Sequence, residues 1–474
     1  VKSIELNGMN SVSEISIGSG SLRGIESLRI GSVNGVVLSS FGVSCSSSNC
    51  VILNESCILR NVKQLMIMND GLNGLVQFKI SGLSKLDSVM IGDGSVRGLV
   101  SSTDSLFSIS NCSSLKSLVI GNGSVINYKR LVLTGLNKLT SLSFGSNSLS
   151  NVERMELSSL SLKRLMFVSN GFVNTRELIL NGLNELESVV IGSGSFRMSG
   201  NERNDGLLKV QNCVKLKSIE MGNGSFEDYE SIELNNLIAL ESLAFGSNCF
   251  RYASSLSMNG LNGLRSIRFG SSSFTQITSL PSNVLQRLAS LTIGSSALSQ
   301  LQSFPLSSMT SLQSLTIGSN TFGGIQFLDL SSTNTLHSIS IGSGSFSGVE
   351  SLRVGNSSIQ VLRAFGLADY ASGECFSLSG QSLLGNVKTM EIVSNTFNSF
   401  TSFAIEGASK LQTLTIGSSS FRGNANAASS FRITNCSSLN SVTIGSGSFL
   451  YYTSIIAMDT ANLRSLSLGN AVFS

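Results

Sequence analysis

Apolar and polar residues alternate along short stretches of this chain, and these stretches return at a regular interval. Segments such as Ser242–Phe245 place an apolar side chain at every second position and end in a bulky apolar residue followed by glycine. An alternation of period two is typical of a strand with one buried face. A second short alternation, such as Ser231–Leu234, lies about midway between two copies. The pattern predicts two strands and two corners in each repeat.

We number each repeat from the apolar residue before the glycine, which is position 0. The copies of position 0 are Ile17, Phe41, Ile67, Ile91, Ile120, Phe144, Phe167, Ile191, Met221, Phe245, Phe269, Ile293, Ile317, Ile341, Phe365, Ile392, Ile416, Ile444 and Leu468. Most neighbouring copies are 24 residues apart. This period predicts one continuous β-rich solenoid over residues 1–474, with about 19 turns and little or no α-helix.

The turn sequences vary at defined places. The longer gaps predict lengthened loops around 43–57, 97–109, 197–208, 367–380 and 422–431. Segments 25–42 and 349–366 are similar in sequence, and each precedes a lengthened turn, which indicates duplicated modules. Pro281 and Pro305 occupy the same slot of the second strand in successive turns. Because proline donates no ladder hydrogen bond, we expect that strand to be interrupted there.

Positions +1 to +5 predict a tight turn followed by a core residue. Position +1 is glycine in nearly every copy, and position +3 is mostly Gly, Asn or Ser, as at Gly194 and Asn320. Exchange between Gly and Asn is typical of a backbone position with positive φ. Position +5 is bulky and apolar, so its copies should form an aromatic column inside the stack. The phenylalanines of this column are Phe172, Phe196, Phe226, Phe250, Phe274, Phe322, Phe346, Phe397, Phe421, Phe449 and Phe473.

The repeat resembles a known class of repeats. The pattern I-G-x-x-x-F, followed by L-x-L and L-x-x-L, is similar to the BspA-like (treponemal) class of leucine-rich repeats, which carries I-G-x-x-A-F in a unit of about this length. Ile191–Phe196 and Ile317–Phe322 fit residue by residue, and the resemblance covers essentially the whole chain. The family's strand-ending proline and the cysteine after the phenylalanine are absent here. The resemblance implies a right-handed leucine-rich-repeat coil and a secreted or cell-surface protein that binds protein or glycan partners without enzymatic activity.

Composition narrows the function classes further. Charged residues make up 13% of the chain, and its net charge of +4 is spread without a cluster, which argues against a nucleic-acid partner. No apolar run approaches the ~20 residues of a membrane span. The single histidine, His337, lies in a variable hydrophilic slot and should face solvent. We therefore predict no catalytic, cofactor or metal site, and no enzymatic activity.

Cysteines and sequons are the remaining candidate sites. Cys112, Cys213 and Cys436 replace a core leucine, whereas Cys45, Cys50 and Cys57 are close enough in sequence for one disulfide, either Cys45–Cys50 or Cys50–Cys57. Such a bond would favour an oxidising compartment. If the chain is secreted, six N-x-S sequons are candidate N-glycosylation sites. They are Asn54, Asn111, Asn122, Asn223, Asn356 and Asn435.

A row of small hydroxyls and the two termini decide the functional hypotheses. Position −3 is Ser or Thr in most copies, as at Ser290 and Ser314, which predicts either local hydrogen bonding or a ribbon that contacts another copy or a glycan. The chain begins inside a repeat and stops one residue after Phe473 without a capping unit, so it is either part of a longer protein or docks head to tail. We expect a non-enzymatic extracellular or cell-surface structural or adhesive protein that self-assembles into filaments or a coat. The alternative is a recognition module that binds a protein or glycan through the ribbon and the lengthened loops.

Overall fold

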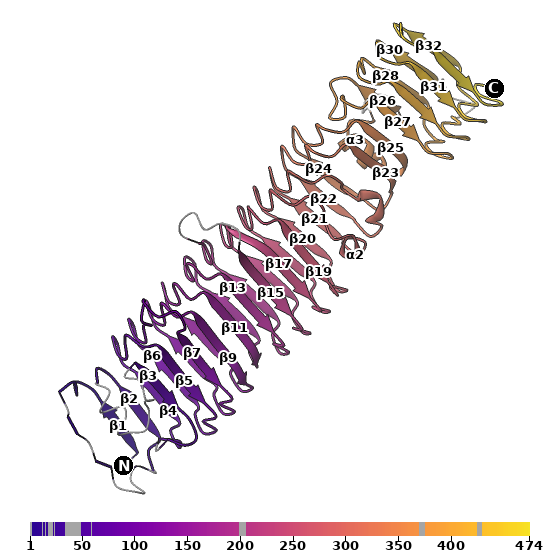
Figure 1. Cartoon of the computed structure of the whole chain (residues 1–474). Coiled ribbons are helices and arrows are strands. Elements are labelled where there is room, and N and C mark those ends of the chain that lie inside the picture. Colours follow the sequence, from indigo (N-terminus) through magenta and orange to yellow (C-terminus); the bar gives the residue numbers. More distant parts are fainter. Residues whose placement is uncertain are drawn as a thin grey trace. The chain divides into compact units, whose positions relative to one another are not determined.

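The computed structural model describes residues 2–11, 13–14, 16–17, 22, 24–33, 49–57, 59–198, 205–368, 375–423 and 429–474. The chain packs as two compact units, Val1–Leu264 and Arg265–Ser474. Each unit is a stack of short strands joined by tight turns (Figure 1). The described residues contain about 18 turns with a period near 24 residues and almost no helix, which confirms the predicted β-solenoid.

The first unit contains the strands β1 to β19. The first strands lie in two parallel sheets. The first sheet contains, in order, β1 (Ser3–Leu6), β2 (Ser27–Ile30), β4 (Gln64–Ile67), β6 (Ser88–Ile91), β8 (Ser117–Ile120) and β10 (Ser141–Phe144). The second sheet contains β12 (Arg164–Phe167), β14 (Ser188–Ile191), β16 (Ser218–Met221) and β18 (Ser242–Phe245). The second strands form a parallel sheet of β3 (Cys50–Leu53), β5 (Gln77–Ser81), β7 (Leu106–Ser110), β9 (Arg130–Leu136), β11 (Arg154–Leu160), β13 (Glu177–Asn181), β15 (Gly206–Gln211), β17 (Tyr229–Asn235) and β19 (Ser255–Asn259).

The second unit repeats this arrangement with three short helices. One row of paired strands contains β20 (Ser266–Phe269), β21 (Ser290–Ile293), β22 (Ser314–Ile317) and β24 (Ser338–Ile341). A second sheet contains β23 (Phe327–Thr333), β25 (Ser351–Ser357), β27 (Thr389–Ile392), β29 (Thr413–Ile416), β31 (Ser441–Ile444) and β33 (Ser465–Leu468). A third sheet contains β26 (Cys375–Ser379), β28 (Ser402–Glu406), β30 (Ser430–Thr434) and β32 (Ser454–Met458). The helices are α2 (Ser282–Leu285), the 3-10 turn η1 (Leu306–Ser308) and α3 (Ile359–Ala364).

Proline explains two of these helices. Pro281 immediately precedes α2, and Pro305 immediately precedes η1. Both helices stand where other turns carry a second strand, which confirms the predicted interruption.

Neighbouring turns pair in parallel and in register. Ser290 pairs with Ser314 and Ile293 with Ile317, so each slot of the repeat becomes a row along the stack. The same pairing shortens the predicted lengthened loops. Part of each of those loops belongs to a strand, namely β3, β7, β15, β26 or β30, because it stacks on a neighbouring second strand.

The turn after each first strand contains alternating positive φ angles. Position +3 has positive φ, as at Gly194 (68°) and Asn320 (56°), which confirms the expectation from the Gly/Asn exchange. Position +5 also has positive φ, for example 57° at Phe196, which the residue pattern did not predict. The left-handed conformation costs a non-glycine residue about 1–2 kcal/mol. Burial of the ring offsets that cost, since Phe196 is completely inaccessible to solvent.

The position +5 phenylalanines stack on one another inside the solenoid. The rings of Phe172 and Phe196, and of Phe196 and Phe226, lie 4.7 Å apart and within 10° of parallel. Phe274 and Phe322 are also buried, whereas Phe397 and Phe473 are partly exposed. The other buried members of the column are Phe172, Phe196, Phe226, Phe250, Phe346, Phe421 and Phe449.

Glycine at position +1 is required by the spacing between turns. A Cβ on Gly294 would lie 2.4 Å from the backbone nitrogen of Ser271, and one on Gly318 would lie 2.3 Å from that of Ser295. These distances are far below van der Waals contact. Close approach of two backbones, rather than a positive φ, therefore selects glycine here.

Three predicted copies of position 0 need comment. Phe41 lies outside the described residues, and Ile17 is not in a strand. Phe365 is wrong as a strand end, because it follows α3 and its ring packs 5.3 Å from that of Phe346.

Two strands, β2 and β25, pair with first strands although their residues Ile30 and Val354 are not among the predicted copies of position 0. Val354 in β25 pairs with Leu330 of β23 on one side and with Ile392 of β27 on the other. Ile30 in β2 pairs with Leu6 of β1 and with Ile67 of β4. At β2 and at β25, a strand in the position of a second strand pairs in register with a first strand of the next turn. Each of these parallel sheets therefore contains second strands before this point and first strands after it. The similar segments 25–42 and 349–366 contain β2 and β25.

Candidate functional site

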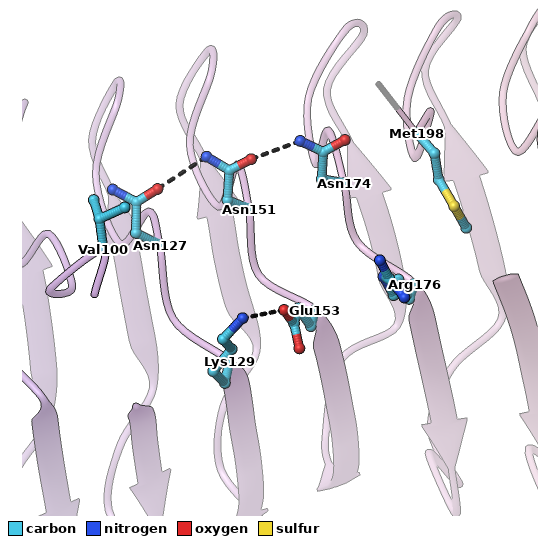
Figure 2. Close-up of a pocket in the computed structure, with 8 residues that line it drawn as sticks. All are labelled: Val100, Asn127, Lys129, Asn151, Glu153, Asn174, Arg176 and Met198. Carbon is cyan, nitrogen blue, oxygen red and sulfur yellow. Dashed lines mark hydrogen bonds and ion pairs between the residues drawn. The ribbon is translucent and has the colours of Figure 1, made fainter. Parts of the chain in front are cut away.

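A shallow groove of about 400 Å³ follows one corner of the first unit. Figure 2 shows that its residues come from successive turns, with an upper row of asparagines and a lower row of charged side chains. The lining residues are Val100, Asn127, Lys129, Asn151, Glu153, Asn174, Arg176 and Met198. The sequence analysis did not single out this groove, although its asparagines recur at position +7.

The upper row is a ladder of side-chain amides. Asn151 donates from Nδ2 to Oδ1 of Asn127 at 2.9 Å, and Asn174 donates to Oδ1 of Asn151 at 2.7 Å. All three residues have φ between 60° and 65°, which asparagine tolerates better than most residues. Positive φ and the in-register stack together place the three amides in one line.

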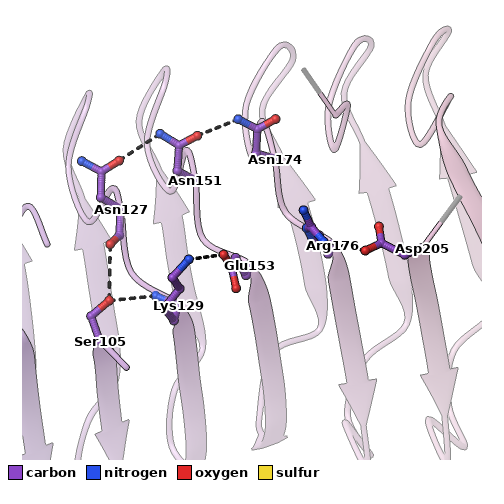
Figure 3. A network of polar contacts seen from close by, with 8 residues as sticks. All are labelled: Ser105, Asn127, Lys129, Asn151, Glu153, Asn174, Arg176 and Asp205. Carbon is purple, nitrogen blue, oxygen red and sulfur yellow. Dashed lines mark hydrogen bonds and ion pairs between the residues drawn. The ribbon is translucent and has the colours of Figure 1, made fainter. Parts of the chain in front are cut away.

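The lower row consists of ion pairs between adjacent turns. Lys129 pairs with Glu153, and Arg176 pairs with Asp205 at 2.6 Å (Figure 3). Ser105 accepts a hydrogen bond from the backbone nitrogen of Lys129 at 3.0 Å. The four charges sum to zero. Because all four side chains are partly exposed, each ion pair contributes at most about 1 kcal/mol to the free energy of folding. The groove thus presents amides and neutralised charges, which suit an uncharged polar ligand better than an ion.

The predicted ribbon of position −3 hydroxyls lies on the outer face of the first strands. Ser266, Ser290, Ser314 and Ser338 pair in register in the second unit, and each is partly or fully exposed. Further along the chain, Thr389 donates from Oγ1 to Oγ of Ser351 at 2.8 Å. The ribbon is therefore a solvent-facing row with at least one direct hydroxyl contact between turns.

A second hydroxyl row, at position +4, lies inside the solenoid and was not recognised as such from the sequence. Ser225 and Ser273 donate from Oγ to the carbonyl oxygens of Gly222 and Gly270, each at 2.6 Å. Both serines are fully buried. Cys249 occupies the same slot and donates from Sγ to the carbonyl oxygen of Gly222 at 3.0 Å. The recurrence of a small polar residue before the core phenylalanine was the available signal.

The cysteines separate into two groups. Cys50 is disulfide-bonded, and Cys45 lies outside the described residues. Cys57 is a buried free thiol, so the alternative Cys50–Cys57 bond is wrong. It is turned into the apolar interior, where it is only 5% exposed. Cys112, Cys213, Cys249, Cys375 and Cys436 are also buried free thiols.

The six sequons lie at the surface but differ in their hydrogen bonding. Asn54 is partly exposed, and the other five asparagines are exposed. Asn122 uses its amide within the stack, since Nδ2 donates to Asp93 at 3.3 Å and Oδ1 accepts from the backbone of Ser146. Asn223 similarly accepts from the backbone of Ser247 at 2.8 Å. The exposed asparagines are Asn111, Asn122, Asn223, Asn356 and Asn435.

The described residues offer few other sites for chemistry. His337 is exposed, as its slot predicted. Within the described part of the chain, no group of three or more His, Cys, Asp or Glu residues could hold a metal ion. No described helix is long and apolar enough to cross a membrane.

Comparisons with solved structures return leucine-rich repeat proteins, while no protein-family model and no curated protein matches the chain. One is a leucine-rich repeat protein from Bacteroides ovatus, with 12% identity, coverage of 88% of both chains and a TM-score of 0.22. Another is CroV588, described as a circular leucine-rich repeat protein, with 13% identity, coverage of 96% of this chain and 77% of that one, and a TM-score of 0.21. A third is the TLR13–ssRNA13 complex, with 14% identity, coverage of 98% and 84%, and a TM-score of 0.21.

These low identities and TM-scores carry no argument about function. The period and the parallel pairing of the chain itself define its fold as a leucine-rich-repeat type of β-solenoid.

Proposed function

We propose that this chain is a non-enzymatic, extracellular or cell-surface structural repeat protein of the BspA-like class, and that it associates with further copies of itself. The observation that carries the proposal is the outer face of the first strands. Its position −3 hydroxyls stack in register and are partly or fully exposed, as at Ser266, Ser290, Ser314 and Ser338. The parallel outward row of Thr292, Thr316 and Ser340 is also uncharged. A face of small uncharged polar side chains can pack against a second copy because little charge repulsion opposes the contact.

Self-association is tested by light scattering coupled to size-exclusion chromatography at micromolar concentrations. We expect oligomers whose mass rises with protein concentration, and we expect Ser314→Glu to reduce them because it places a charge in the hydroxyl row. Ser255→Glu is a matched control, since Ser255 is exposed but lies on the second strand β19. A strict monomer, or equal loss of oligomers in both variants, would overturn the proposal.

A second candidate function is recognition of an uncharged polar partner. It is favoured by the corner groove of Figure 2, where amides and mutually paired charges face solvent. Binding of soluble protein or glycan partners by the monomer would support it, and Asn151→Ala would then weaken binding because it removes the central amide of the ladder.

A further inference from the structure

We propose that the outer face of the second unit's sheet carries a binding site for a neutral carbohydrate where β23, β25, β27 and β29 meet. A trough of about 350 Å³ opens there. This inference extends the recognition function and does not depend on self-association. The residues that line the trough include Phe327, Ser351, Arg353, Glu391, Thr413 and Thr415.

The trough exists because large and small outward-facing side chains lie next to one another in two rows. One row runs through Phe327, Ser351, Thr389 and Thr413, and the parallel row runs through Asp329, Arg353, Glu391 and Thr415. Leu328 and Leu330 of β23 are buried, so Phe327 and Asp329 face outward. Phe327 and the Arg353–Glu391 pair rise around a floor of Ser and Thr.

Phe327 is an unusual residue for its slot. Several corresponding positions of other second strands hold polar residues, such as Glu177 of β13 and Ser231 of β17, and the apolar residues Leu106 and Leu207 are not aromatic. Its ring is 52% exposed, and among the described residues it stacks on no other ring. An exposed, unstacked aromatic face beside hydrogen-bonding groups can cover the apolar C–H face of a sugar ring.

The polar groups of the trough suit hydroxyl ligands. Arg353 Nε lies 3.5 Å from Glu391 Oε1, yet this buried nitrogen has no hydrogen-bond acceptor within the described part of the chain. Glu391 is 53% exposed and can accept from a ligand hydroxyl, while Thr413 and Thr415 can both donate and accept. A ligand with several neighbouring hydroxyls would satisfy these groups together.

The charge of the trough selects against acidic ligands. Asp329, Arg353 and Glu391 lie side by side in one row, and their charges sum to −1. A phosphate or a uronic acid would face this excess negative charge. A neutral sugar would not, which is why we assign the site to neutral carbohydrate rather than to nucleotides or acidic glycans.

The test is calorimetric titration of the full chain with hexasaccharides of glucose, N-acetylglucosamine, galactose, mannose and xylose, together with a hexasaccharide of glucuronic acid. We expect at least one neutral hexasaccharide to bind and the acidic one to bind more weakly. Phe327→Ala should weaken the neutral interaction about tenfold, because it removes the stacking face. Phe327→Tyr should retain binding, and Glu391→Gln should weaken it while improving binding of the acidic sugar.

Two controls separate this site from general surface effects. Tyr451→Ala removes another exposed aromatic side chain, and Thr443→Ala removes a hydroxyl from the same sheet face outside the trough. Both variants should bind like the parent chain. The proposal is overturned if no neutral hexasaccharide binds, if the acidic one binds better, or if Phe327→Ala binds normally. Ser314→Glu measured in parallel should retain sugar binding even where it abolishes self-association, because Ser314 lies outside the trough.

Discussion

The hydroxyl of Tyr452 donates to the carbonyl oxygen of Phe400 at 2.9 Å, although the two residues belong to turns that are separated by a third. The intervening turn contains the lengthened loop that begins at Arg422. There, a Cβ on Gly423 would lie 3.3 Å from the Tyr452 ring. The tyrosine therefore packs beside Gly423 and links the turns on either side of the intervening one.

The same slot is used in the first unit. Tyr229 donates from its hydroxyl to the carbonyl oxygen of Thr175, again across a lengthened turn. Tyr128 occupies the equivalent position after the loop near 97–109, but its buried hydroxyl has no hydrogen-bond partner among the residues that the structure describes. The same slot therefore holds a tyrosine whose hydroxyl has a hydrogen-bond partner at Tyr229 and Tyr452, and one without a described partner at Tyr128.

We expect opposite effects from removing these hydroxyls. Tyr452→Phe leaves the carbonyl oxygen of Phe400 unpaired and should destabilise its unit by about 1–2 kcal/mol. Tyr128→Phe removes an unpaired buried hydroxyl and should be neutral or stabilising. Denaturant midpoints and hydrogen exchange around each turn would measure both effects. Equal destabilisation by the two variants would contradict the assignment of partners.

Gly318 should tolerate no side chain at its position +1, because the neighbouring turn approaches it closely. Gly318→Ala places a Cβ against the backbone of the preceding turn and should cost more than about 2 kcal/mol, because the strands on both sides must separate. Gly323→Ala is the control, since its Cβ would approach nothing closer than 3.7 Å. Thermal unfolding of the two variants would show whether spacing between turns, rather than glycine content, sets the requirement.

The internal hydroxyl row should contribute to stability at each turn. Ser273→Ala removes a buried hydrogen bond to the Gly270 carbonyl and should cost about 1 kcal/mol. Cys249→Ser should be nearly neutral, because the hydroxyl can donate to the same carbonyl as the thiol. Ser254→Ala, at an exposed serine, should change the free energy of unfolding by less than about 0.5 kcal/mol. A null effect for Ser273→Ala would show that the row is dispensable.

Buried thiols should make the protein sensitive to alkaline pH. Burial raises the pKa of both Cys112 and Cys213 to about 11 from an ordinary value of 9.0. The folded state holds these thiols protonated, so their contribution is complete below pH 9 and is lost as pH rises towards 11. Burial also raises the pKa of Tyr229, which adds to the loss at still higher pH.

A cysteine variant isolates this contribution. Cys213→Ala should unfold at a lower temperature at neutral pH because of its cavity, yet its melting temperature should fall less steeply between pH 9 and 11 than that of the parent chain. Thiol reagents at pH 8 should leave both cysteines unmodified until the protein unfolds. Identical pH slopes in the two proteins would exclude Cys213 as a source of the alkaline sensitivity.

The sequence by itself determined the features that depend on one turn and its copies. The 24-residue period, the strand before each glycine, the positive φ at position +3 and the breaks at Pro281 and Pro305 follow from local preferences repeated along the chain. Tertiary structure decided what depends on the distance between turns. The contact that excludes a Cβ at Gly318, the positive φ of Phe196 and the internal bond of Ser273 exist only once neighbouring turns are stacked.

The exchange of strand roles at β25 has the same origin. Val354 and Phe365 are both apolar residues before glycine, so the local pattern fits either as a strand end. Pairing with β23 and β27 selects Val354, while the interior around Phe346 takes Phe365 after a helical turn. The trough beside Phe327 is a further consequence, because residues from four strands form it only when that register is fixed.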